Sequence, residues 1–232
     1  MIPLPADSTG TMKPTHLIFD MDGTIIDSMP VHRSSWALFA ARHGLLDRPD
    51  ELERATSGRT GVEGMRALFG AELPLAQAEA YVHEKESLYR EQFGAAFRWV
   101  PGFERFAQRA RASGLRCGLG TAGDRHNIGF CLDRLPPMLR TGLFEVCVGG
   151  DEGLPGKPDP AIFLAVAQRM GVDPADCLVF EDSPAGIAAA ARAGMRAVAL
   201  LTSHAADELA GSHVVAAVSD YDELLASPLC PF

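Results

Sequence analysis

Short apolar runs recur along the chain at wide intervals, and each has the length of a β-strand. Because they are apolar on both faces, they are typical of strands in a parallel sheet that helices cover on each side. From about residue 101 onward, stretches rich in Ala, Arg and Leu alternate with these runs. The alternation predicts an α/β fold with a doubly wound, Rossmann-like parallel sheet. The predicted strands span 16–20, 115–121, 146–148, 177–181, 196–200 and 213–217, and the helices of this part span 103–113, 125–135, 160–170 and 184–193.

The segment 29–100 breaks this alternation, because it holds helical patterns but no strand pattern. The economical interpretation is a small all-helical cap domain (29–100), inserted after the first strand of an α/β core domain (15–28 and 101–232). Such an insert would lie above the carboxyl ends of the strands, where open α/β sheets bind their ligands. The predicted helices of the insert span 30–43, 61–69 and 75–97.

Composition narrows the possible functions. The 232 residues are 47% hydrophobic, which suits one domain with an insert, and no run reaches the roughly 18 apolar residues of a membrane span. The net charge of −9 argues against a nucleic-acid partner, which favours a basic surface. Five scattered cysteines indicate reduced thiols, and residues 1–14 are predicted to be a loose polar leader without the order of a signal peptide. A cytoplasmic protein is expected.

Acidic residues stand at the ends of two predicted strands. Asp20 and Asp22 follow the first strand, and Glu181 and Asp182 end the strand at 177–181. Parallel strands bring these ends to one edge of the sheet, so four carboxylates would converge there. They cannot all be ionised in one pocket without a cation. Oxygen ligands of this kind suit Mg²⁺, which also accepts phosphate oxygens from a substrate.

Two further strand ends supply groups that bind anions. Thr121 and Ala122 offer a hydroxyl and backbone amides just ahead of a predicted helix. Lys157 offers a positive charge between a glycine and a proline. Together with the carboxylates and a metal ion, these groups are what phosphoryl transfer to an enzyme aspartate needs.

These residues also carry a resemblance. The segment Asp20-Met21-Asp22-Gly23-Thr24, then Thr121, Lys157 and Glu181-Asp182, resembles the four ordered motifs of the haloacid dehalogenase superfamily. The likeness spans about residues 16–200, and the helical insert is similar to the small cap of that superfamily's first subclass. A lone first motif is a weak signal, whereas four motifs in order, each at a predicted strand end, are specific.

The resemblance implies a role for each motif residue. Asp20 would be the nucleophile and a metal ligand, and Asp22 would bind the metal through its carbonyl and act as general acid, then general base. Thr121 and Lys157 would hold the transferring phosphoryl group. A carboxyl group at position 22 argues against dehalogenation, which expels halide without protonating a leaving oxygen. The resemblance completes the metal site with Asp182, and with Glu181 as a further ligand or as a partner of one.

Within the superfamily, residues 27–36 and Gly58-Arg59-Thr60 resemble the cap-entry segment and cap loop of the β-phosphoglucomutase-like group, and Lys85 with Tyr89 resembles its long cap helix. This analogy places His32 near Asp22, and Arg59 near a distal substrate group. Simpler interpretations compete: a hinge histidine for His32, a surface charge for Arg59, and a partner in i,i+4 ion pairs for Lys85.

The sequence thus predicts a Mg²⁺-dependent phosphatase that acts on a small phosphomonoester, with a sugar phosphate as the favoured substrate class, through an aspartyl-phosphate. Thr24 and Ile26 match the hydrolases of the group rather than its mutases. The alternatives are a β-phosphoglucomutase-type sugar phosphomutase, since one fold hosts several chemistries, and a non-enzymatic phosphate-sensing module. The sequence leaves the oligomeric state open.

Overall fold

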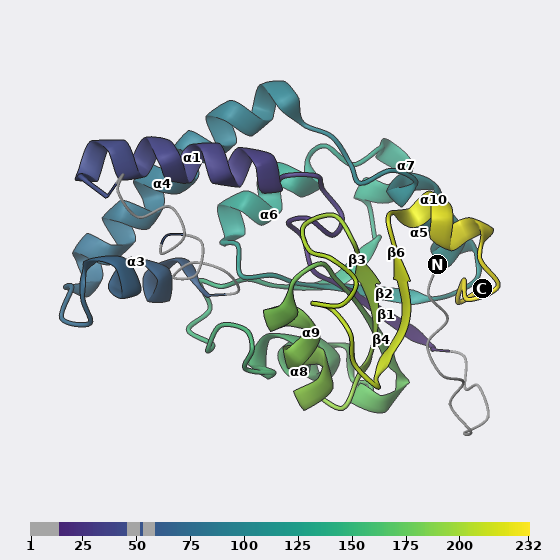
Figure 1. Ribbon diagram of the computed structural model, residues 1–232. Helices are drawn as coiled ribbons and strands as arrows, with labels where there is room; N and C mark the ends of the chain where they lie inside the picture. Colours follow the sequence, from purple (N-terminus) through teal and green to yellow (C-terminus); the bar gives the residue numbers. More distant parts are fainter. Residues whose placement is uncertain (1–13, 46–51, 53–58) are drawn as a thin grey trace.

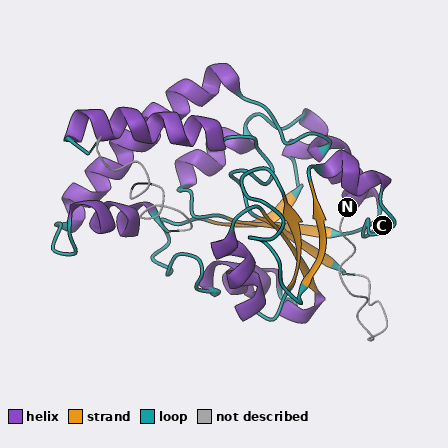
Figure 2. Cartoon of the chain, in the orientation of Figure 1, coloured by secondary structure: helices purple, strands orange, loops and turns teal. Residues whose placement is uncertain are grey.

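The computed structural model describes residues 14–45, 52 and 59–232, so residues 1–13 of the expected leader and Gly58 of the cap loop lie outside the described residues. The strands of the described chain form one sheet in the order β3-β2-β1-β4-β5-β6, and every pairing is parallel (Figure 2). The predicted doubly wound α/β fold is therefore confirmed. The strands are β1 (His16–Phe19), β2 (Arg116–Gly120), β3 (Phe144–Val148), β4 (Cys177–Glu181), β5 (Arg196–Leu200) and β6 (Val214–Val218).

Helices cover the two faces of this sheet (Figure 1). Alternate residues of β1 belong to different cores, with Leu17 and Phe19 in one and Ile18 in the other. The first core includes residues of α5 (Phe103–Ala112), α6 (Arg125–Leu132), α7 (Pro137–Arg140) and α10 (Tyr221–Ala226). The second core includes residues of α8 (Ala161–Met170) and α9 (Pro184–Arg192). Burial on both faces explains why these strands are apolar throughout.

A separate layer of helices lies beyond one end of the sheet (Figure 1). It contains α1 (Met29–His43), α3 (Gly61–Phe69) and α4 (Leu75–Ala96), which pack around an apolar cluster of their own. The two connections between this layer and the sheet pair with each other. Ile26 forms an antiparallel bridge with Trp99, and the amide of Asp27 donates to the carbonyl of Arg98 at 3.0 Å.

The observed helices and strands differ little from the predicted ones, and the differences concern short elements and the ends of longer ones. The helix α7, the 3₁₀ turn η1 (Pro174–Asp176) and α10 were not predicted, because elements of three to six residues are too short to show a helical period. The strand β3 begins at Phe144, two residues before its predicted start. The helix α6 ends at Leu132, ahead of the turn that leads to Pro136.

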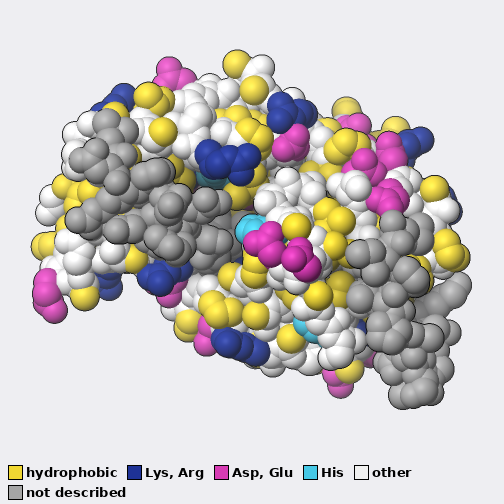
Figure 3. All heavy atoms as spheres, in the orientation of Figure 1, with side chains coloured by type: hydrophobic (Ala, Val, Ile, Leu, Met, Phe, Trp, Pro, Cys, Tyr) yellow, Lys and Arg dark blue, Asp and Glu magenta, His cyan; other side chains and the backbone are white. Residues whose placement is uncertain are grey.

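The surface is mixed in character. On the face drawn in Figure 3, basic and acidic side chains are interspersed among apolar ones. None of the helices in the described part combines the length and the apolarity that crossing a membrane requires.

Candidate active site

The register of the central strands brings the predicted site together. Phe19 pairs with Leu119 on one side and with Phe180 on the other, so the carboxyl ends of these three strands lie next to one another. A cavity of about 430 Å³ opens between these strand ends and the helices α1, α3 and α4. Every site residue expected from the sequence lines this cavity: Asp20, Asp22, His32, Arg59, Lys85, Thr121, Ala122, Lys157, Glu181 and Asp182.

Lys157 is the buried centre of the core side of the cavity. Its Nζ donates to Asp20 Oδ1 at 2.5 Å, to Glu181 Oε1 at 2.7 Å and to the carbonyl of Gly120 at 3.3 Å. Burial alone would lower the pKa of Lys157, but the two carboxylates outweigh it and raise this pKa above its usual value. The lysine is therefore a fixed ammonium directly beside the carboxylate of Asp20.

Glu181 contacts protein donors through both of its oxygens. Oε1 accepts from Lys157, while Oε2 accepts from the amides of Asp182 at 2.9 Å and Ser183 at 2.8 Å. The carboxylate lies against the first turn of α9, because a Cβ on Gly186 would come within 1.8 Å of it. Both oxygens of Glu181 are therefore engaged, one by Lys157 and the other by the start of the loop that carries Asp182.

Asp20 and Asp182 carry more negative charge than their surroundings balance. Burial raises the pKa of both carboxyl groups, and repulsion from Glu181 adds to the effect, although Lys157 acts against it. The turn after β1 lies directly against Asp182. Gly23 in this turn has φ +74°, and a Cβ there would lie 2.1 Å from Asp182 Oδ2. Only glycine fits this approach. The three carboxylates of this cluster share a single lysine, so the site suits an added cation.

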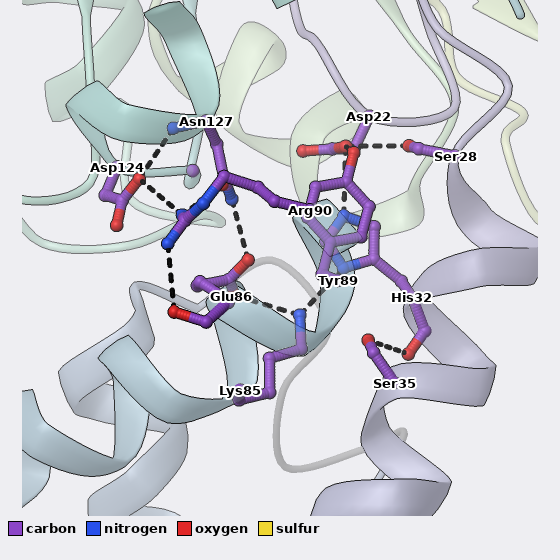
Figure 4. A network of polar contacts seen from close by, with 12 residues as sticks. Asp22, Ser28, His32, Ser35, Lys85, Glu86, Tyr89, Arg90, Asp124 and Asn127 are labelled. Atoms are coloured by element: carbon purple, nitrogen blue, oxygen red, sulfur yellow. Dashed lines mark hydrogen bonds and ion pairs between the residues drawn. The ribbon is translucent and has the colours of Figure 1, made fainter. Parts of the chain in front are cut away.

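Asp22 has the opposite environment, although it is two residues from Asp20. Its Oδ1 accepts from Ser28 Oγ at 2.7 Å, lies 3.0 Å from His32 Nε2 and accepts from the Tyr89 hydroxyl at 3.2 Å (Figure 4). Burial opposes ionisation of this carboxyl group, but His32 and Ser28 outweigh it and lower the pKa of Asp22 to about 2. The side chain is therefore an ionised carboxylate that contacts α1 and α4.

The loop after β2 brings a hydroxyl and backbone amides to the cavity. Thr121 is buried, and its Oγ1 accepts from the amide of Gly123 at 3.0 Å. Ala122 lies against Gly150, where a Cβ would meet the Ala122 carbonyl oxygen at 2.1 Å. Close packing of two loops therefore fixes the backbone at 121–123, which lines the same cavity as Asp20.

Three residues of the helical layer were expected at the site. His32 stacks on Tyr89, with ring centroids 3.9 Å apart, and its Nδ1 lies 2.8 Å from Lys85 Nζ (Figure 4). Lys85 is buried and also contacts Glu86 Oε1 at 2.8 Å, so it does not form the exposed i,i+4 pairs of the simpler interpretation. Arg59 lines the cavity with an exposed side chain.

Four polar residues that the sequence did not predict to contact the site residues extend this group. Ser28 and Tyr89 complete the contacts of Asp22, while Glu86 and Asn127 form a hydrogen bond of 2.7 Å between α4 and α6. Local signals existed for two of them. Tyr89 stands one helical turn after Lys85, and Asn127 stands in the first turn of the helix that follows Thr121.

The comparisons with known proteins agree with this geometry. A sequence model of the haloacid dehalogenase-like hydrolases matches residues 14–194. The chain is 35% identical over 195 residues to protein CbbY of Rhodobacter capsulatus, which covers 78% of this chain and 83% of that protein. It is 30% identical over 187 residues to a phosphorylated carbohydrates phosphatase of Thermotoga maritima, with coverage of 78% and 82%. The crystal structure of a hydrolase from Pseudomonas syringae matches with a TM-score of 0.79 and 26% identity, covering 92% of this chain and 96% of that one.

The fold and the site define an α/β enzyme whose carboxylates and buried lysine meet at the carboxyl ends of parallel strands. The chain belongs to the haloacid dehalogenase-like hydrolases. The family expected from the four motifs is thereby confirmed.

Proposed function

We propose that this hydrolase is a Mg²⁺-dependent phosphatase that cleaves a small phosphomonoester, of the sugar-phosphate class, through an aspartyl-phosphate on Asp20. The observation that carries the proposal is that Asp20 lines the cavity with its Oδ1 2.5 Å from the ammonium of Lys157. The relative from Thermotoga maritima, named as a phosphorylated carbohydrates phosphatase, supports both the reaction and the substrate class.

In the first step, a carboxylate oxygen of Asp20 attacks phosphorus, and the bond between phosphorus and the leaving oxygen breaks. Lys157 neutralises the charge of the phosphoryl group next to Asp20, while the hydroxyl of Thr121 and the amide of Ala122 hold the remaining phosphate oxygens. The leaving alkoxide takes a proton from the carboxyl group of Asp22. This step therefore requires a protonated Asp22.

In the second step, water attacks the phosphorus of the aspartyl-phosphate and the bond to the Asp20 oxygen breaks. The carboxylate of Asp22 takes the proton of that water and returns to the acid form. The contacts of Asp22 with Ser28, His32 and Tyr89 favour the ionised form that this step uses.

The donor set fits magnesium. The ion would be held by side-chain oxygens of Asp20 and Asp182 and by the main-chain carbonyl of Asp22. The excess of buried negative charge on the two aspartates would favour its binding. When bound, Mg²⁺ would neutralise charge on the phosphate oxygens. Glu181, whose oxygens already contact Lys157 and two amides, would keep the lysine and Asp182 in place.

We further propose that the layer of α1, α3 and α4 is the cap expected over residues 29–100. A cap of this kind closes over the substrate and excludes bulk water. One contact already joins it to the catalytic loops, because the amide of Gly156, next to Lys157, donates to Glu63 Oε1 of α3 at 3.2 Å. The paired connections at Ile26 and Trp99 would be the hinge.

A panel of sugar phosphates, sugar alcohol phosphates, nucleotides and small organic phosphates, with release of inorganic phosphate as the readout, tests the proposal. The wild-type enzyme with Mg²⁺ is expected to release phosphate fastest from a sugar phosphate. Asp20→Asn is expected to retain the fold and to lose activity by about 10³-fold or more, because the nucleophile is gone.

The competing functions give different results in the same assay. Conversion of β-glucose 1-phosphate to glucose 6-phosphate without free phosphate would replace the phosphatase with a mutase. Binding of phosphate esters without turnover, unchanged in Asp20→Asn, would indicate a sensing module.

A further inference from the structure

The cap and the core touch through a polar cluster that the proposed reaction does not use. Glu86 and Arg90 project from α4, and Asn127 projects from α6 (Figure 4). Asn127 is buried, its Nδ2 donates to Glu86 Oε2 at 2.7 Å, and its Oδ1 accepts from Arg90 Nη1 at 2.8 Å. Both groups of the amide are therefore used in contacts between the two layers.

The cluster has a fixed order of donors and acceptors. An arginine only donates and a carboxylate only accepts, so a 180° rotation of the Asn127 amide would place donor against donor and acceptor against acceptor. Burial opposes ionisation of Glu86, yet the ammonium of Lys85 outweighs it and holds the pKa of this carboxyl group below its usual value. The carboxylate that joins Asn127 to Lys85 is thus ionised.

The same order continues to Asp22. Lys85 Nζ contacts Glu86 Oε1 at 2.8 Å and His32 Nδ1 at 2.8 Å. Because an ammonium only donates, Nδ1 must accept, and the proton of a neutral imidazole is then on Nε2. This Nε2 is the atom 3.0 Å from Asp22 Oδ1. A continuous chain of contacts therefore runs from α6 of the core, through α4 of the cap, to the proposed acid and base.

We propose that Glu86, Arg90 and Asn127 form a latch between cap and core, which sets Lys85 and, through the tautomer of His32, the orientation of Asp22. The proposal rests on the proposed role of Asp22 and makes Glu86 and Asn127 positioning residues, because they act through other side chains. Opening of the cap would separate α4 from α6 and release this chain. The proton transfers of Asp22 would then be favoured only when the cap is closed.

Exchanging the partners tests the latch. In Glu86→Gln the side-chain amide has one acceptor oxygen for two donors, so its NH2 group faces either Asn127 Nδ2 or Lys85 Nζ. Asn127→Asp places two carboxylates together. The double variant E86Q/N127D restores the match of donors and acceptors. The amide now at position 86 donates to the carboxylate now at position 127 and accepts from Lys85. Arg90 still donates to the side chain at position 127. Glu91→Gln is the matched control, since Glu91 lies on the same helix with an exposed side chain.

Two probe substrates separate positioning of Asp22 from general damage. Glycerol 2-phosphate releases an alkoxide that needs a proton, whereas p-nitrophenyl phosphate releases a phenolate that leaves without one. The ratio kcat/KM covers the steps up to departure of this group. Each single variant is expected to lose about 10- to 100-fold on glycerol 2-phosphate, which is part of a general-acid contribution, and at most about threefold on p-nitrophenyl phosphate.

The double variant is expected to return to within about threefold of wild type on glycerol 2-phosphate, and Glu91→Gln to match wild type on both probes. Equal losses on the two probes, or no recovery in the double variant, would overturn the latch. If Asn127→Asp fails to fold, Asn127→Ala carries the same expectation, because it removes the latch without opposing two carboxylates. A wild-type enzyme that hydrolyses neither probe would instead count against the proposed function.

Discussion

Asp20 and Asp22 stand two residues apart, yet the fold gives them opposite surroundings. Asp20 shares Lys157 with Glu181 and lies near Asp182, and burial with this repulsion raises its pKa. Asp22 faces the cap, where hydrogen-bond donors outweigh burial and lower its pKa to about 2. A cation beside Asp20 would reverse the shift at that residue, because a nearby positive charge favours the ionised carboxylate that a nucleophile needs.

The comparison extends to the two clusters around these aspartates. The core cluster has an excess of negative charge, so it is suited to receive a cation, which could in turn accept phosphate oxygens. The cap cluster pairs Glu86 with Lys85 and surrounds Asp22 with Ser28, His32 and Tyr89, so these carboxylates have partners without a ligand. The two clusters therefore differ in what they lack: the carboxylates of the core cluster lack a balancing cation, whereas those of the cap cluster are held in place by neighbouring side chains.

Removing Lys157 should break the core cluster with the largest effect. In Lys157→Met, Asp20 and Glu181 would be buried without a cation, so we expect a loss of about 3–5 kcal/mol in the free energy of unfolding and of at least about 10²-fold in kcat/KM. Denaturant unfolding and phosphate release measure the two losses. The double variant K157M/E181Q should regain part of the stability and none of the activity. Recovery of activity there would contradict the proposed role of the lysine.

Changing Asp182 should separate stability from activity. We expect Asp182→Asn to raise the melting temperature of the metal-free protein by about 2–4 °C, because one like charge leaves the cluster. The same variant should lose turnover with Mg²⁺. Thermal unfolding with EDTA and with Mg²⁺ checks this, and the wild-type protein should be stabilised by Mg²⁺ more than the variant. If Mg²⁺ stabilised the wild-type protein and the variant equally, Asp182 would not be a ligand of the ion.

Arg59 should give the smallest effect, because its side chain is exposed at the cavity. We expect Arg59→Ala to raise KM for the best sugar phosphate by about fivefold, which corresponds to about 1 kcal/mol, with kcat nearly unchanged. Arg105→Ala is the control, since Arg105 pairs with Asp222 and does not line the cavity. A fall in kcat with constant KM would assign Arg59 to the chemical step instead.

Most of the fold could be predicted from the sequence because its signals are local. Buried strands are apolar throughout, and the predicted runs coincide with β1 to β6 within about two residues. The short helix α10 was not predicted, because its six residues form less than two helical turns and show no clear hydrophobic period. For the site, acidic residues at strand ends were enough to place Asp20 and Asp182 together, because parallel strands end at a common edge.

The direction of individual side chains could not be predicted in this way. Glu181 follows the same rule of position as Asp182, yet its carboxylate faces Lys157 and the start of α9. Asn127 and Glu86 are 41 residues apart and meet only because α4 packs over α6. Neither residue type is distinctive, so no spacing in the sequence pointed to their contact.

The sequence by itself determined the parallel sheet, the order of its motifs and the kinds of chemical group at each strand end, because these follow from local hydrophobic pattern and from the geometry of parallel strands. Only the tertiary structure decided which carboxylate meets the lysine, which one turns toward the helical layer and which residues join the two layers. Such choices depend on packing and hydrogen bonds between segments far apart in the chain, where a difference of one rotamer changes the partner of a charge.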